Sequence, residues 1–328
     1  TVLGGVGGGT GADTITLTGT VTASVSGEDG DDVLRLAAGT TVTGAFDGGL
    51  GSDTLDGGNT ASTYVISGVD SGLISGRLNS FAGIENLQGG TAADSFRFQS
   101  GGTLTNGSID GGTGGGDQIR GDSGNNLFLV SGLDAGQYTS VSGAGSIAFS
   151  DVEGLDGNTG DDTFTFENAG FLSEALAGGL GNDELVGAAN GDVFHVTGAA
   201  NSGVLYDLNP AAPATKTGPR MTGFSGIENL TGRNGNDHFA IDMDLSGNIE
   251  GGGGANTMTL DIINASVGGT VSNVGVTPMI GGTAGDDTII VRRNVFNQIE
   301  VEQNGTVRTL FVPSAQLDVN LIVDVSAT

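Results

Sequence analysis

Acidic residues at the ends of glycine-rich turns are the strongest candidates for a chemical role in this sequence. Three turns carry two aspartates six or seven residues apart, namely Asp47 and Asp53, Asp110 and Asp117, and Asp156 and Asp162. Hard cations such as Ca²⁺ take several oxygen ligands, from carboxylates and from the backbone carbonyls of flexible turns. If such turns stack in register, their carboxylates repel one another unless a cation lies between them. The pattern predicts calcium sites; the alternative is ordinary Gly-Asp turn chemistry with the acids facing water.

A repeat of 18 residues must position these turns. Residues 81–98, 149–166 and 224–241 align without gaps, and each has Phe first, then Ile-Glu or Val-Glu, a glycine-rich turn, one Asp and an alternating apolar end. A finer repeat of a glycine-rich turn, Asp or Asn, and alternating apolar residues runs through the chain, mostly in one or two multiples of about 21 residues. Repeats of this length are typical of stacked solenoids.

The apolar residues of each repeat alternate, as in Asp162-Thr163-Phe164-Thr165-Phe166, and no segment has helical periodicity. Alternation is the signature of a strand with one buried face. The 64 glycines supply the positive φ that tight corners require. The sequence therefore predicts an all-β protein, a right-handed parallel β-solenoid of about 15 coils.

Spacing and composition divide the chain. Residues 1–287 are expected to form the solenoid, with a super-repeat of 68 and then 75 residues between Asp94, Asp162 and Asp237. Residues 207–222 hold three of the five prolines and are expected to be a loop extruded from it. Residues 288–328 are expected to be a C-terminal cap or the start of a next module, with a hairpin turning at Asn304-Gly305. Since the chain begins in mid-pattern without Met, we expect a segment of a longer polypeptide.

The charge balance limits the partners. Ten Lys and Arg stand against 38 Asp and Glu, a net charge of −28. Nucleic acid is excluded because phosphate contacts need a basic face, and divalent cations are the natural counterions. No cysteine is present for disulfides or thiolate metal sites. No apolar stretch reaches 18 residues, so direct membrane insertion is not expected.

Two nonapeptide-like stretches, GGLGNDELV and DGGLGSDTLD, resemble the haemolysin-type calcium-binding repeat, whose pattern is Gly-Gly-x-Gly-x-Asp-x-apolar-x. The match covers about a third of the chain, with Asn126 and Asn256 in place of the Asp and Ala92-Ala93 in place of the inner glycine. The longer unit with its GIENL phrase is similar to giant repetitive exoproteins of Gram-negative bacteria, which are adhesins or filament-forming surface proteins. The resemblance implies Ca²⁺ bound between turns of a parallel β-roll, at Asp53, Asp117, Asp183, Asp192, Asp162, Asp237 and Asp287.

Catalysis is the rival class, because parallel β-helices host polysaccharide lyases and epimerases. The groups for it are few: two histidines, three tyrosines and ten basic residues. His195 and His238 are expected to be packed or solvent-facing, and the Glu of the GIENL phrase (Glu85, Glu153, Glu228) to face outward from its strand. An ice- or carbohydrate-binding module is a further alternative; ice binding is suggested by Thr14 and Thr16, whose spacing does not recur from repeat to repeat.

We therefore expect no enzyme. The expected function is a structural segment of an extracellular or cell-surface bacterial repeat protein, a filament, spacer or adhesin stiffened by calcium. Unpaired strand edges at a solenoid's ends invite pairing, so the expected partners are other copies of the chain or the rest of a longer one. A surface glycan is a further candidate partner.

Overall fold

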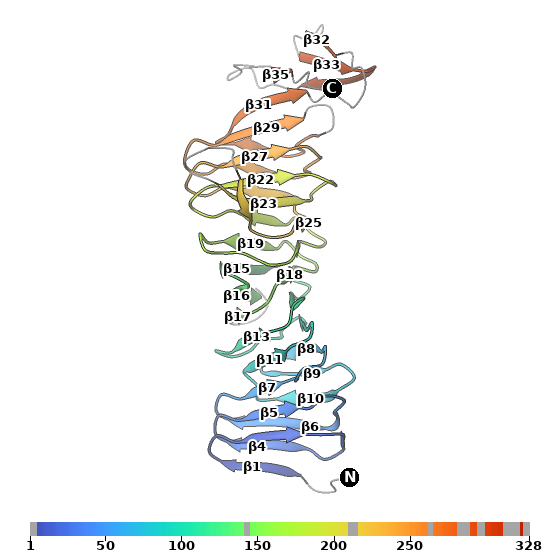
Figure 1. Ribbon diagram of the computed structural model, residues 1–328, viewed down its shortest axis with the longest axis vertical. Helices are drawn as coiled ribbons and strands as arrows, with labels where there is room; N and C mark the ends of the chain where they lie inside the picture. Colours follow the sequence, from blue (N-terminus) through green and yellow to red (C-terminus); the bar gives the residue numbers. More distant parts are fainter. Residues whose placement is uncertain are drawn as a thin grey trace. The chain divides into compact units, whose positions relative to one another are not determined.

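The computed structural model describes residues 5–140, 145–208, 216–261, 265–280, 289–293, 299–310 and 322–323. These residues form strands and turns and no helix, which confirms the all-β prediction (Figure 1). Their strands belong to two mostly parallel sheets and one three-stranded antiparallel sheet. Within these ranges, nothing helical has the length and apolarity of a membrane span. The chain divides into two compact units, Thr1–Val186 with Arg220–Ile227, and Gly187–Pro219 with Glu228–Thr328.

The alternating sequence builds strands with one buried face. In β19 (Thr163–Phe166) both phenylalanines are buried and both threonines are partly exposed, as predicted. Parallel neighbours place like residues side by side, so that the rings of Phe128 and Phe164 stack at 4.8 Å between centroids. A column of aliphatic side chains follows the same register and is almost fully buried: Leu34, Leu55, Leu87 and Ile109. The core is thus a stack of equivalent positions.

One sheet of the first unit contains two runs of parallel strands. The first run is β1 (Val6–Thr10), β4 (Val25–Asp29), β6 (Thr41–Leu50) and β10 (Leu78–Ala82), with β3 (Thr20–Val21) also beside β6. The second run is β8 (Thr63–Gly68), β12 (Ser95–Phe98), β14 (Gln118–Arg120), β18 (Gly154–Asp156), β20 (Leu176–Ala177) and β25 (Phe224–Ser225). The antiparallel strand β9 (Ser71–Ile74) lies between β8 and β10 and joins the two runs.

The other sheet of the first unit is built in the same way. Its first parallel run is β2 (Thr14–Leu17), β5 (Val33–Leu36), β7 (Thr54–Asp56), β11 (Asn86–Gly90), β13 (Ser108–Gly112) and β17 (Ile147–Ser150). The antiparallel strand β16 (Ala135–Ser140) links β17 to a second run, which contains β15 (Asn126–Gly132), β19 and β21 (Glu184–Val186).

The second unit has two parallel runs. One is β22 (Asp192–Val196), β27 (His238–Ile241), β29 (Thr257–Asp261), β31 (Gly275–Ile280) and β35 (Ile322–Val323). The other is β26 (Asn229–Thr231), β28 (Ile249–Glu250) and β30 (Val271–Ser272). The three-stranded sheet is β32 (Ile289–Arg293), β33 (Ile299–Gln303) and β34 (Thr306–Leu310). Asn304 and Gly305, both with positive φ, connect β33 to β34. The predicted hairpin is confirmed.

Three antiparallel hairpins mark the super-repeat: β8–β9, β15–β16, and β22 with β23 (Gly203–Leu208). Their turns hold Asp70, Asp134 and Asn201 at equivalent places, each with φ near 50°. Each side-chain Oδ1 accepts a backbone N–H from a residue 35 to 45 positions later, namely Thr105, Ser173 and Ser246. The repeat seen in the sequence therefore recurs as a structural unit whose turn side chains fasten the following segment.

The structure differs from the expectation of one extruded loop over residues 207–222. Asp207 and Leu208 belong to β23, which pairs with the antiparallel strand β24 (Lys216–Pro219); residues 209–215 lie outside the described ranges. Arg220 is completely buried, and its guanidinium donates to the carbonyls of Asn168 (3.2 Å) and Gly170 (3.1 Å) and lies over the ring of Phe171. The end of this segment is therefore part of the first unit's core.

Candidate functional site

Buried acids tie consecutive repeats together through backbone hydrogen bonds. The amide of Asp13 donates to Oδ1 of Asp32 (2.7 Å), and the amide of Asp32 donates to Oδ1 of Asp53 (2.8 Å). Asp32 and Asp53 are at most 1% exposed. Each carboxylate thus completes the backbone hydrogen bonding of the repeat before it, where a buried N–H without a partner is costly.

The same contact recurs with donor–acceptor distances of 2.6 to 2.8 Å, and we call the whole set the carboxylate ladder. In the first unit the further steps, from amide to side-chain oxygen, are Ser62 to Asp94, Asp94 to Asp117, Asn126 to Asp162, and Asp162 to Asp183. In the second unit they are Asp192 to Asp237 and Asp237 to Asn256. Most residues predicted to bind calcium therefore lie in this ladder: Asp53, Asp117, Asp162, Asp183, Asp192 and Asp237.

The second carboxylate oxygen of the ladder acids is the chemically open feature. Oδ2 is buried without a hydrogen-bond partner in Asp13, Asp32, Asp53, Asp94, Asp117, Asp162 and Asp237. Burial raises the pKa of Asp94 and Asp117 to about 6, and that of Asp162 and Asp237 to about 7. Near neutral pH these oxygens are thus placed to accept a proton or a cation.

A glycine five or six residues before each ladder acid leaves room for Oδ2 of that acid. A Cβ built on Gly232 would lie 2.4 Å from Oδ2 of Asp237 and 2.5 Å from the carbonyl oxygen of Gly251. A Cβ built on Gly157 would meet Oδ2 of Asp162 at 2.3 Å and the carbonyl oxygen of Gly178 at 2.4 Å. The spacing of Gly and Asp in the repeat therefore reflects packing: the acid fills the space that a side chain at the glycine would need.

Replacement of Gly48 by alanine tests this packing. The added Cβ would lie 1.8 Å from the carbonyl oxygen of Gly83 and 2.6 Å from Oδ2 of Asp53. Because both neighbours are held in the stack, we expect a loss of about 3 kcal/mol in the free energy of unfolding, measured by urea denaturation. Gly115→Ala is the control, since its Cβ would meet nothing within 4 Å. Equal stabilities of the two variants would contradict this account.

The Glu of the GIENL phrase was predicted to face outward, and for two copies this is wrong. Oε2 of Glu85 accepts the amide of Asp53, and Oε2 of Glu153 accepts the amide of Asp117, both at 2.8 Å. Glu153 is only 9% exposed. These glutamates therefore take the place of a ladder aspartate. A sequence signal existed, because each Glu precedes a ladder Asp by nine residues, the spacing that also separates Asp183 from Asp192.

The acids upstream of the ladder have other partners. Asp110 accepts the amide of Gly112 (3.0 Å) and the side-chain amide of Gln88 (3.2 Å). Asp156 accepts the amide of Asn158 (2.8 Å) and pairs with Arg120 at 3.4 Å. Asp47 is exposed, and Asp287 lies outside the described residues. Within the described ranges, no three Asp, Glu or His side chains come close enough to hold a metal ion between them.

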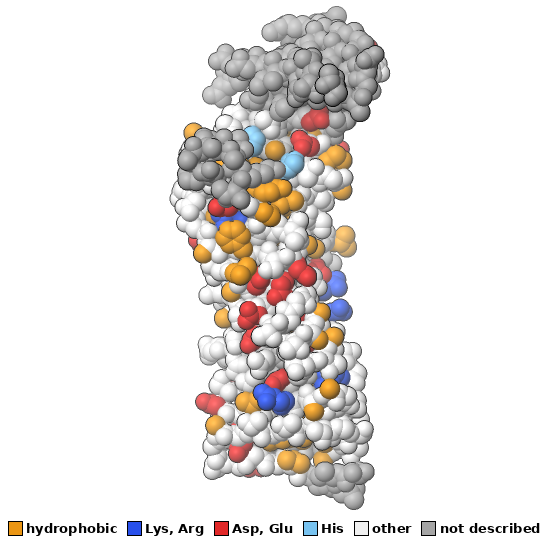
Figure 2. All heavy atoms as spheres, viewed as in Figure 1, with side chains coloured by type: hydrophobic (Ala, Val, Ile, Leu, Met, Phe, Trp, Pro, Cys, Tyr) orange, Lys and Arg blue, Asp and Glu red, His pale blue; other side chains and the backbone are white. Residues whose placement is uncertain are grey.

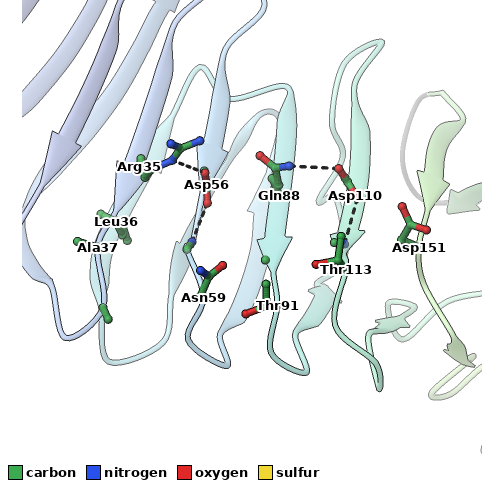
Figure 3. Close-up of a pocket in the computed structure, with 14 residues that line it drawn as sticks. Arg35, Leu36, Ala37, Asp56, Asn59, Gln88, Thr91, Asp110, Thr113 and Asp151 are labelled. Carbon is green, nitrogen blue, oxygen red and sulfur yellow. Dashed lines mark hydrogen bonds and ion pairs between the residues drawn. The ribbon is translucent and has the colours of Figure 1, made fainter.

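A polar groove of about 510 Å³ crosses the first unit at the ends of β5, β7, β11 and β13 (Figure 3). One side carries Arg35, Asp56, Gln88 and Asp110, which occupy matching register positions on these neighbouring parallel strands. Arg35 donates to Asp56 at 2.6 Å, and Gln88 donates to Asp110. Sequence reasoning predicted Asp110 as a metal ligand and did not predict the groove.

Both histidines lie on the face drawn in Figure 2, in the second unit. Nε2 of His195 lies 2.6 Å from Oδ2 of Asp242. Nδ1 of His238 lies 2.9 Å from the hydroxyl of Thr257. They occupy adjacent strands, where His195 is in register with Ala240, two residues beyond His238. Each ring is thus held by a polar neighbour on the outside of its strand.

No family model and no curated protein matches this chain.

Proposed function

We propose that the chain is a structural segment of a secreted or cell-surface bacterial repeat protein, a filament, spacer or adhesin. In this proposal the two mostly parallel sheets are faces of a right-handed parallel β-solenoid of about 15 coils. A right-handed crossover is the general rule for parallel strands of one sheet. Each coil then contacts only the coils next to it, and the repeated interfaces between coils make the solenoid resist bending and stretching.

The carboxylate ladder is the observation that carries this proposal. Its acids are buried and engage the backbone of the neighbouring repeat, as Asp32 engages Asp13 and Asp237 engages Asp192. The chain thus devotes its most regular charged residues to joining repeats. A segment whose function is mechanical needs this kind of contact at every step along the stack.

Calcium is the cation that we propose for the ladder. The buried Oδ2 atoms of Asp53, Asp117, Asp162 and Asp237 have no hydrogen-bond donor, and each lies, together with a backbone carbonyl oxygen, within 2.9 Å of the position that a Cβ on a nearby glycine would take. Carboxylate and carbonyl oxygens are the donors that Ca²⁺ takes. A bound cation would offset the repulsion among these acids and join adjacent repeats.

Thermal unfolding and small-angle scattering, recorded in millimolar calcium and in excess chelator, test both parts of the proposal. Scattering is expected to report an elongated particle under both conditions, because the stack is made by the chain. Calcium is expected to raise the melting temperature, because a ligand of the folded state stabilises it by mass action; magnesium at equal concentration controls for ionic strength. A compact scattering profile would refute the solenoid segment, and identical melting curves would refute only the calcium.

A further inference from the structure

We propose that the polar groove of the first unit binds an extended, uncharged oligosaccharide that lies across the strands. The groove has two parallel rows of polar side chains with a floor of glycines between them. The inner row is Arg35, Asp56, Gln88 and Asp110. The outer row is Asn59, Thr91 and Thr113, each three residues after its inner-row counterpart (Figure 3). This proposal is independent of the mechanical function.

The floor is backbone because every strand turns at the same place. Gly58, Gly90 and Gly112 each follow an inner-row residue by two positions and have positive φ of 70°, 147° and 104°. Residues other than glycine rarely adopt this backbone conformation. The three glycines leave a flat strip against which the C–H face of a sugar ring can pack, while its hydroxyls reach the rows on either side.

The inner row is held in place and still has hydrogen-bonding capacity. Asp56 accepts the amide of Gly58 at 2.7 Å and Nε of Arg35, which orients both side chains. Asp110 is oriented in the same way by Gly112 and Gln88. Carboxylate oxygens accept more than one hydrogen bond, and the guanidinium of Arg35 has four N–H groups besides Nε. Preorganised donors and acceptors of this kind lose little entropy on binding.

The spacing of the rows distinguishes a sugar chain from a peptide. Neighbouring strands of a sheet lie about 4.8 Å apart, so equivalent groove residues repeat at this distance. The rings of an extended β-1,4-linked oligosaccharide follow one another at roughly 5 Å and alternate in orientation, so each ring would lie beside one strand and like groups would recur at every second strand. An extended peptide presents like groups about 6.7 Å apart and would lose register after one strand.

The charge of the groove excludes anionic sugars. Asp56, Asp110 and Asp151 line it, whereas Arg35 is its single basic residue and is paired with Asp56. The chain as a whole carries a net charge of −28. A polyuronate would be repelled by this field, while neutral hydroxyls donate readily to carboxylates.

Titration calorimetry on the whole chain with a neutral β-1,4-linked glucose pentasaccharide tests the proposal, with a uronate pentasaccharide and an extended uncharged peptide as comparison ligands. We expect binding of the neutral sugar, and at least about tenfold weaker binding of the other two. Gln88→Ala and Thr91→Val remove one hydrogen-bonding group from each row, and each is expected to weaken binding about three- to tenfold. Gln118→Ala on β14 is the matched control and should bind as the wild type does.

Melting curves establish that the variants are folded. If Gln88→Ala is destabilised, Thr91→Val still tests the proposal, because valine keeps the shape of the threonine side chain. Absence of neutral-sugar binding at millimolar concentration would overturn the proposal. Equal affinity for the uronate, tighter binding of the peptide, or unchanged affinity in both groove variants would overturn it as well.

Discussion

Replacing Arg220 with alanine is expected to lower the free energy of unfolding by roughly 3 to 5 kcal/mol. The guanidinium is completely buried, and the substitution would leave the carbonyls of Asn168 and Gly170 without these donors and a cavity beside Phe171. A buried carbonyl that loses its donor costs about 1 to 3 kcal/mol. Urea denaturation followed by circular dichroism measures the change.

Arg97→Ala is the matched control, because Arg97 is exposed and its Nε donates to the hydroxyl of Ser95 in its own strand. It should change stability by less than about 0.5 kcal/mol. Arg77→Ala should resemble Arg220→Ala, since Arg77 donates to the carbonyls of Gly57 and Ala37 and likewise precedes the first Phe of an 18-residue copy by four positions. If Arg220→Ala were as mild as Arg97→Ala, the burial of Arg220 would contribute little to the stability of the fold.

Without calcium, the protein is expected to lose stability as the pH rises from about 4 to about 7. Burial raises the folded-state pKa of Asp237 from 3.8 to about 7. Between these values the folded state binds more protons than the unfolded state, so the free energy of unfolding falls with rising pH and levels off above pH 7. Asp162 behaves alike, and Asp94 and Asp117, with a pKa of about 6, contribute up to pH 6. Each acid contributes about 1 kcal/mol or more.

Asp237→Asn isolates the contribution of one ladder acid. The neighbouring Asn256 shows that an amide fits a ladder position, because its Nδ2 donates to the carbonyls of Gly251 (2.8 Å) and Asn273 (3.1 Å). In wild type, Oδ2 of Asp237 is an acceptor that receives no hydrogen bond. An asparagine would put an NH₂ group there, which can donate to the carbonyl of Gly251. We therefore expect Asp237→Asn to stabilise the calcium-free protein at pH 8 by about 1 kcal/mol or more, and to flatten the pH profile.

Asp237→Ala is the companion variant, which removes the oxygen that accepts the amide of Asp192 and should therefore destabilise at every pH. In saturating calcium the advantage of Asp237→Asn should shrink or reverse, because the substitution removes a charged cation ligand. A pH profile identical in the wild type and in Asp237→Asn would show that this carboxyl does not titrate between pH 4 and 7.

Local structure follows from neighbouring residues in the sequence. Alternation of Thr and Phe in residues 163–166 specifies a strand with one buried face, since side chains alternate across every strand. The Asn304-Gly305 pair specifies its hairpin, because both residues tolerate positive φ. The fixed spacing of glycine and aspartate marks most residues of the carboxylate ladder. These features depend on neighbouring residues alone.

The contacts between repeats, and the role of each acid, depend on the tertiary fold. Glu85 accepts the amide of Asp53 across 32 residues, because the β8–β9 hairpin lies between them. Since such insertions differ in length, the partner of each acid is set by which strands pair and not by a fixed separation in sequence. Arg220 is buried because its guanidinium reaches the carbonyls of Asn168 and Gly170, 52 and 50 residues earlier in the chain, although its own segment is rich in proline. The groove exists because residues three apart on successive strands align in parallel register. Such pairings depend on long-range register, which local composition does not encode.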